Sequence, residues 1–150
     1  MTLQEAYNFF ESFKKETTKK SEIKIYENFL HILSELKNRE FSKDEIQSLE
    51  TELEHLNLEA NSGNRKKYLN KRLTAFKEYL KNKHSLITVG YYANIGVSMG
   101  AAFGVVAGIV FGERFEKSLG LAAGISIGML IGAIIGRSMD EKAKSEGRMI

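Results

Sequence analysis

Apolar residues recur at helical spacing through the first half of the chain and then fill two long runs in the second half. Residues 1–85 mix apolar and charged positions with the three-to-four-residue period of amphipathic helices. Residues 85–112 and 118–136 contain no Asp, Glu, Lys or Arg. The pattern predicts an all-α chain, in which an N-terminal bundle of about four amphipathic helices precedes two apolar helices.

Capping signals delimit the amphipathic helices. The first is expected to begin at Thr2 and the third at Ser42, because a Glu follows each of them three residues later, as in a capping box. The second is expected over about residues 22–38. The expected inward-facing apolar residues are Leu3, Ala6, Tyr7, Phe10, Phe13, Ile25, Phe29, Ile32, Leu33, Leu36, Ile46, Leu49, Leu53, Leu56, Leu69, Leu73, Phe76 and Leu80.

The fourth amphipathic helix is predicted to start at Arg65, after a turn in the sequence NSGN that contains Gly63. We expect this helix to continue through a collar at residues 85–90, with Gly90 as a joint before the first apolar helix. Residues 1–85 would then form one helical domain.

The two uncharged runs are long enough to cross a lipid bilayer. At about 1.5 Å per residue, roughly 20 residues cross the hydrocarbon core of about 30 Å. The predicted transmembrane hairpin covers residues 86–138, with spans at about 88–112 and 118–137, and is followed by a tail at 139–150. The alternative is a helical hairpin buried inside a soluble protein, but such helices normally show a charged face.

Charged residues beside the two runs predict the orientation of the hairpin. Lys and Arg are dense in the segment KKYLNKRLTAFKEYLKNKH before the first run, and four more follow the second. The connecting loop carries only Arg114 and Lys117, beside Glu113 and Glu116. The positive-inside rule therefore places both termini in the cytoplasm, as in a multi-pass protein of the cytoplasmic (inner) membrane. The residues expected to contact lipid headgroups are Lys81, Lys83, Tyr91, Tyr92 and Arg137.

Glycine recurs at every fourth position in both runs. The predicted helix-packing residues are Gly96, Gly100, Gly104, Gly108 and Gly112 in the first run, and Gly120, Gly124, Gly128, Gly132 and Gly136 in the second. Glycine weakens a helix in water by about 1 kcal/mol relative to alanine. In lipid it lets two helix backbones approach closely, which favours helix association. The two ladders therefore predict helix–helix contacts along the whole depth of the membrane.

Residues 90–138 resemble the glycine-zipper class of bacterial membrane proteins, in which GxxxGxxxG segments line helix contacts. The resemblance implies a two-helix membrane protein with a helical cytosolic head. Many members of the class form homo-oligomers and some form channels.

Two uses of the ladders compete. In the first, the ladders face each other within one hairpin and make a compact anchor. In the second, one ladder packs within the subunit and the other against a neighbour, so that a ring closes. Small residues beside the ladders favour the second use, and they are Ala93, Ser98, Ala101, Ala102, Ala107, Ala122, Ala123, Ser126 and Ala133. If the ring contained a pore, its lining would include Asn94, Ser98 and Ser126.

Two of the amphipathic helices carry opposite net charges. Residues 40–62 hold seven acids and one lysine, whereas residues 63–85 hold eight basic groups and one acid. We expect these helices to lie antiparallel with opposite charges facing, and a smaller role for the basic helix in attracting anionic lipid. Nucleic acid is not an expected partner, because the sequence has no recognition motif.

The sequence shows no catalytic constellation. It has no cysteine, and its three histidines, His31, His55 and His84, include only one Glu-x-x-His pair, Glu52 with His55. A di-iron bundle requires two such pairs and further glutamates. We therefore expect no enzyme activity, no cofactor and no metal site.

These features predict a homo-oligomeric integral membrane protein, in which glycine-packed helices assemble a ring or pore and the head regulates it. The alternative is a monomeric or dimeric membrane-anchored adaptor, whose head at residues 1–85 binds a cytosolic protein.

Overall fold

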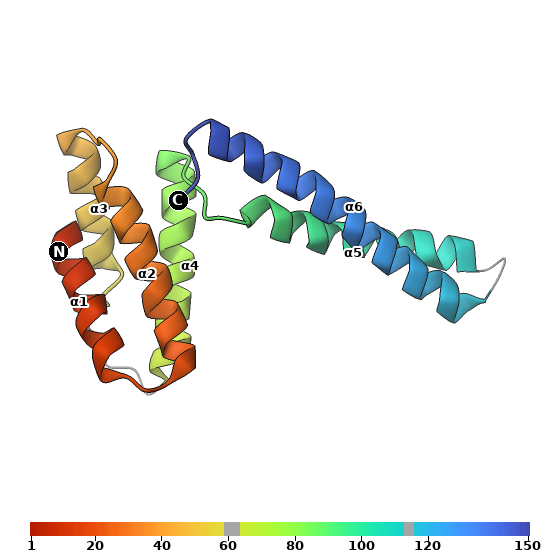
Figure 1. Cartoon of the computed structure of the whole chain (residues 1–150), viewed down its shortest axis with the longest axis horizontal. Helices are drawn as coiled ribbons and strands as arrows, with labels where there is room; N and C mark the ends of the chain where they lie inside the picture. The colour runs from red at the N-terminus through yellow and green to blue at the C-terminus, as the bar shows by residue number, and fades with distance from the viewer. Residues whose placement is uncertain (59–63, 113–115) are drawn as a thin grey trace. The chain divides into compact units, whose positions relative to one another are not determined.

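The chain is all-α, as predicted, with four N-terminal helices and a C-terminal hairpin of two long apolar helices. The computed structural model describes residues 1–58, 64–112 and 116–150. The helices of these residues, labelled in Figure 1, are α1 (Leu3–Glu16), α2 (Lys20–Lys37), α3 (Lys43–His55), α4 (Arg65–His84), α5 (Tyr91–Gly112) and α6 (Lys117–Ser145). They form two compact units: the head, residues 1–86 with Ile150, and the hairpin, residues 87–149.

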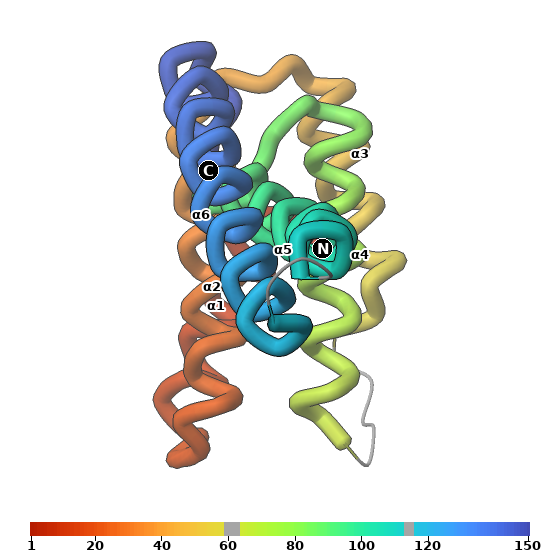
Figure 2. Tube along the Cα trace, turned by 90° about the vertical axis from the view of Figure 1, so that its right-hand side faces the viewer, coloured from red at the N-terminus to blue at the C-terminus, as the bar shows by residue number. Residues whose placement is uncertain are grey.

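The head is a bundle whose core is built from aromatic and aliphatic side chains. Figures 1 and 2 both show α1 to α4 running side by side along one direction. Phe29 lies at the centre, because its ring stacks on Phe10 at 4.2 Å and faces Phe76 at 6.4 Å between ring centroids. All three rings are fully buried. The periodic apolar positions of α1, α2 and α4 thus meet in one core.

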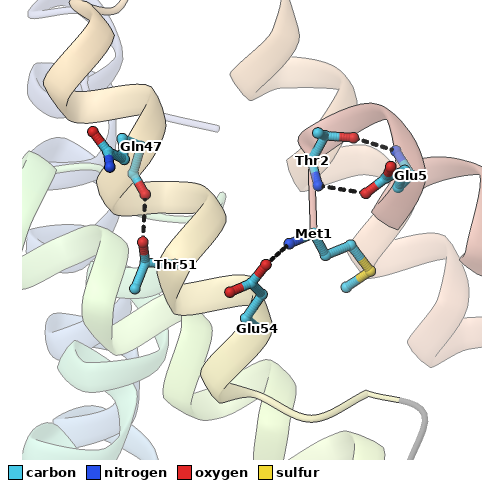
Figure 3. Close-up of polar contacts among 6 residues, drawn as sticks. All are labelled: Met1, Thr2, Glu5, Gln47, Thr51 and Glu54. Atoms are coloured by element: carbon cyan, nitrogen blue, oxygen red, sulfur yellow. Dashed lines mark hydrogen bonds and ion pairs between the residues drawn. The ribbon is translucent and has the colours of Figure 1, made fainter.

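The predicted caps are present. Thr2 and Ser42 each accept a hydrogen bond from the backbone N–H of the Glu three residues later, and that Glu accepts one in return from the cap's backbone N–H. Figure 3 shows the Thr2 cap with its Glu5, and beside it the amino group of Met1 paired with the carboxylate of Glu54 on α3. The first turn of α1 is therefore held to α3.

The collar predicted at residues 85–90 is wrong, because α4 ends at His84. Ser85 adopts the left-handed conformation (φ 56°, ψ 21°), which closes the helix, and the buried Leu86 then joins the head core. Gly90 also has a positive φ, of 77°. The connection to α5 is a nonhelical segment, and the predicted turn residue Gly63 lies outside the described residues.

The helix α6 continues well beyond its apolar run, to Ser145, and ends in a Schellman motif. Gly147 takes a φ of 68°, and the N–H of Arg148 bonds to the carbonyl of Ala143 at 2.9 Å. The chain then pairs in parallel with the segment before α5, where the N–H of Ile87 donates to the carbonyl of Arg148 at 2.9 Å. Beyond this bridge, Ile150 belongs to the hydrophobic cluster of the head.

Candidate functional site

The α5–α6 hairpin has the reverse of the usual distribution of apolar side chains. Within the described ranges, every exposed large apolar side chain except Ile46 lies between Val89 and Met139. Phe103 and Ile134, for example, are 69% and 68% exposed, whereas the buried residues of α5 are glycines alone. Soluble monomers rarely expose a continuous apolar surface of this extent. The two helices are candidate membrane spans by length and composition.

The glycines of the two ladders lie opposite each other within the chain. Figure 1 shows α5 and α6 as an antiparallel pair. The resulting opposed pairs are Gly96 with Gly132, Gly100 with Gly128, Gly104 with Gly124, and Gly108 with Gly120. At the ends of the contact, Gly112 lies against Lys117 and Gly120, and Gly136 lies against Tyr92 and Ala93. All ten predicted helix-packing glycines therefore line the contact between α5 and α6.

Backbone meets backbone at these pairs without room for a methyl group. A Cβ built on Gly96 would lie 2.0 Å from the carbonyl oxygen of Gly132, and one built on Gly132 would lie 1.9 Å from that of Gly96. The glycine Cα–H groups thus point at carbonyl oxygens in reciprocal pairs, which is the geometry of weak Cα–H···O bonds. The same distance is 2.1 Å for Gly100 and 2.7 Å for Gly108, so the helices approach most closely near Gly96.

This arrangement removes one argument for a ring. The sequence alone allows one ladder to face a neighbouring subunit. In the structure, the two ladders pack against each other within the chain. An assembly of several subunits would have to use the outer faces of α5 and α6, where Ala102, Ala122, Ala123 and Ser126 are exposed.

A buried carboxylate closes the open end of the hairpin. Asp140 on α6 is 8% exposed and accepts hydrogen bonds from the backbone N–H groups of Tyr92 (3.0 Å) and Ala93 (3.1 Å). These N–H groups belong to the first turn of α5, where no intrahelical acceptor exists and the helix dipole favours a negative charge. One helix thus caps the other.

The sequence analysis missed Asp140, although the glycine spacing contains the signal for it. Asp140 lies four residues after Gly136 and Tyr92 lies four residues before Gly96, so both residues continue the ladders. When an acidic residue occupies a ladder position opposite the amino end of the other helix, it can cap that helix.

The predicted pore-lining residues lie on the outer surface of the hairpin. Asn94, Ser98 and Ser126 are exposed, and both serines donate to a carbonyl of their own helix four residues earlier, Ser98 at 2.9 Å and Ser126 at 2.8 Å. Backbone bonding of this kind lets a serine sit in an apolar helix without another partner.

The residues predicted at lipid headgroups lie in the last turn of α4 (Lys81 and Lys83), in the first turn of α5 (Tyr91 and Tyr92) and on α6 (Arg137). The rings of Tyr91 and Tyr92 meet edge to face at 5.2 Å between centroids, and both residues are half-buried. Arg137, Lys81 and Lys83 are exposed. The guanidinium of Arg148 donates hydrogen bonds to the carboxylate of Glu146 and shares one with the side chain of Tyr92, and these bonds raise the pKa of Arg148.

Opposite charges on α3 and α4 do not pair directly in the way the sequence suggests. Among the described residues of these two helices, no ion pair joins one to the other, and the polar contact between them is Ser48 Oγ with Tyr79 OH at 2.6 Å. The pKa of Glu45 is lowered by the backbone and side-chain hydrogen bonds of Ser42, and that of Glu54 by the amino group of Met1.

The histidines occupy unrelated positions in the head. His31 and His55 are exposed, and His84 lies between the rings of Phe41 and Tyr79, each 5.7 Å away between centroids. Within the part of the chain that the structure describes, no three His, Asp or Glu side chains are grouped as metal ligands.

Comparison with protein-family models, with curated proteins and with solved structures finds no match to this chain.

Proposed function

We propose that the chain is a membrane-anchored protein, in which the α5–α6 hairpin spans the bilayer and holds the helical head at its surface. The observation that carries this proposal is the inverted hairpin, with glycine inside and large apolar side chains outside. Such a surface is stable when lipid is the solvent. Both helices also satisfy their own backbone hydrogen bonds, which is necessary in the bilayer core because no water is present there. The uncharged runs at 91–112 and 118–136 fit the thickness of the hydrocarbon core.

The head is the part that would meet other proteins. The glycine packing is satisfied within the chain, which favours the adaptor over the ring among the two functions that the sequence suggests. The resemblance to glycine-zipper membrane proteins and the absence of a catalytic motif fit an anchor with a binding head. The excess of Lys and Arg before α5 and after Gly136 supports a cytoplasmic head and a cytoplasmic C-terminus.

Membrane integration and orientation can be tested together. The chain has no cysteine, so a single cysteine reports one position. Asn28→Cys on α2 and Ser118→Cys at the start of α6 are both exposed sites. We expect both variants to stay in the membrane after alkaline carbonate washing, with Ser118→Cys labelled by an impermeant maleimide from outside and Asn28→Cys only in inverted vesicles. Release by carbonate would refute the anchor, and the reverse labelling would refute the orientation.

A homo-oligomeric ring or pore is the second candidate. The exposed small residues Ala122, Ala123 and Ser126 favour it, because they let another helix approach α6. Native mass spectrometry in nanodiscs would show a fixed multimer, which Ala123→Leu would dissociate while the hairpin stays intact. Single-channel recording of the reconstituted protein would then separate a pore from a closed assembly. If the protein is strictly monomeric and shows no conductance, the ring and the pore are refuted and the adaptor is the function that stands.

A further inference from the structure

The basic residues of α4 fall into two groups. Three of the eight are engaged within the head: Arg65 covers the ring of Phe13 at 4.0 Å, Arg72 covers the ring of Tyr68 at 4.7 Å, and Lys77 is partly buried, which lowers its pKa. The other five have exposed side chains, and they are Lys66, Lys67, Lys71, Lys81 and Lys83.

Among the described residues, four of the exposed lysines have no ion pair. None of the head's ion pairs within the described ranges involves Lys66, Lys67, Lys71 or Lys83. The whole of α4 carries a single acid, Glu78. The acidic helix α3, which the sequence offers as the counterpart of α4, does not neutralise these lysines by direct pairing.

We propose that the lysine cluster in the first two turns of α4, defined as Lys66, Lys67 and Lys71, binds the anionic phospholipid headgroups of the membrane in which the hairpin is anchored. The proposal rests on the membrane anchor proposed above and adds the position of the head: α4 lies along the membrane surface. Lysine clusters directly beside a membrane span are attracted to anionic lipid, and the attraction fades within a Debye length of about 10 Å.

Chain length makes this contact geometrically feasible. Only residues 85–90 separate the end of α4 from the start of α5, and six residues span at most about 20 Å. The end of α4 at His84 therefore stays close to the bilayer. The lysines near its beginning lie about 20–30 Å further along the helix axis, so they reach the headgroups only when α4 lies flat.

The contact is electrostatic and does not involve insertion of α4. Its leucines and its phenylalanine, Leu69, Leu73, Phe76 and Leu80, are all buried in the head core, and its other apolar side chains pack against that core, so α4 presents no free apolar face to the acyl region. The ammonium group of lysine is a compact point charge on a flexible side chain, and it can therefore pair with a headgroup phosphate. Anionic lipid is favoured over nucleic acid because the tether keeps a concentrated anionic surface beside these lysines.

The test uses the full chain in nanodiscs of phosphatidylcholine, with and without phosphatidylglycerol. A fluorophore on Asn70→Cys, an exposed position among the lysines, reports contact with lipids that carry a nitroxide headgroup. The same fluorophore on Asn28→Cys of α2 is the reference. The test variant combines Lys66→Gln, Lys67→Gln and Lys71→Gln. Its matched control combines Lys20→Gln, Lys24→Gln and Lys43→Gln, which removes the same charge from exposed positions elsewhere in the head.

We expect quenching at residue 70 to rise when phosphatidylglycerol is present and to fall at high salt, with residue 28 quenched less. Each lysine near an anionic surface changes the ratio of bound to unbound head about fivefold, so the test variant lowers it on the order of 100-fold. The control variant should keep the wild-type quenching.

Equal quenching with and without phosphatidylglycerol, or in the test and control variants, would overturn the proposal. Binding of an oligonucleotide to the head in pure phosphatidylcholine discs, lost in the test variant, would overturn it in favour of nucleic acid. Because the comparison is made only on protein already held in discs, failure of the anchor itself would appear earlier, as failure to incorporate.

Discussion

Adding one methyl group at Gly100, one helical turn from the closest approach at Gly96, should separate α5 from α6. In Gly100→Ala, the new Cβ would lie 2.1 Å from the carbonyl oxygen of Gly128, whereas real Cβ atoms essentially never come closer than 3.0 Å. The backbones must therefore part by about 1 Å, which forfeits up to about half of the local dispersion energy. It also weakens reciprocal Cα–H···O bonds worth about 0.5–1 kcal/mol each. Together these terms predict a loss of about 2 kcal/mol, within the usual range for overpacking.

The same change elsewhere in the ladder gives a graded control. A Cβ on Gly108 would lie 2.7 Å from its nearest neighbour, and one on Gly112 would lie 3.2 Å away. We expect the free energy of unfolding, measured by SDS titration in mixed micelles, to fall most for Gly100→Ala, less for Gly108→Ala and least for Gly112→Ala. Spin labels on Asn94→Cys and Ser138→Cys would show the separation directly. Equal stability of Gly100→Ala and Gly112→Ala, with unchanged label distances, would refute the reasoning.

Three further predictions concern the Asp140 cap, the core of the head and the effect of acid on the stability of the head. Asp140→Ala should cost about 2 kcal/mol by leaving two partly buried N–H groups without an acceptor, and hydrogen exchange at Tyr92 and Ala93 should accelerate, whereas Glu141→Ala at an exposed site should change neither. Unchanged exchange at these two amides would contradict the cap. Phe29→Ala should destabilise the head by about 3–5 kcal/mol, because the ring is fully buried against Phe10, and thermal unfolding followed by circular dichroism would measure it against exposed His31→Ala. Glu45 has a lowered pKa in the folded head, so its cap stabilises above the ordinary value of 4.5 and stops doing so as pH falls through the folded pKa. The stability difference between wild type and Glu45→Ala should therefore be present at neutral pH and shrink in acid, and a constant difference would contradict this explanation.

The sequence predicts most of the helices well because they carry local signals. Thr2 and Ser42 mark helix starts with capping boxes, and the four-residue glycine period marks the contact surface of α5 and α6. The aromatic core follows from helical periodicity alone, which brings Phe10, Phe29 and Phe76 to inward-facing positions. These features depend on neighbours within one or two helical turns.

Spacing alone does not say which surface a ladder meets. A glycine every fourth residue allows the same close approach to a helix of the same chain or of another, so the partner of Gly128 becomes clear only in three dimensions. The end of α4 is similar, because serine is uncommon in the left-handed conformation and nothing local indicates a stop at Ser85. Burial of Leu86 in the head decides it. The return of Ile150 to the head core is also a long-range contact without a local signal.

The cap that Asp140 provides has a consequence for biogenesis. Asp140 follows Tyr92 by 48 residues in the chain. At common rates of translation it is therefore synthesised about 2–10 seconds later. During that interval the first turn of α5 has no carboxylate to accept its N–H groups, so α5 alone is an incomplete structure. Synthesis of α6 supplies both the second glycine surface and the missing acceptor. For the membrane anchor proposed above, insertion of the two helices as a pair is therefore favoured over insertion of one helix after the other.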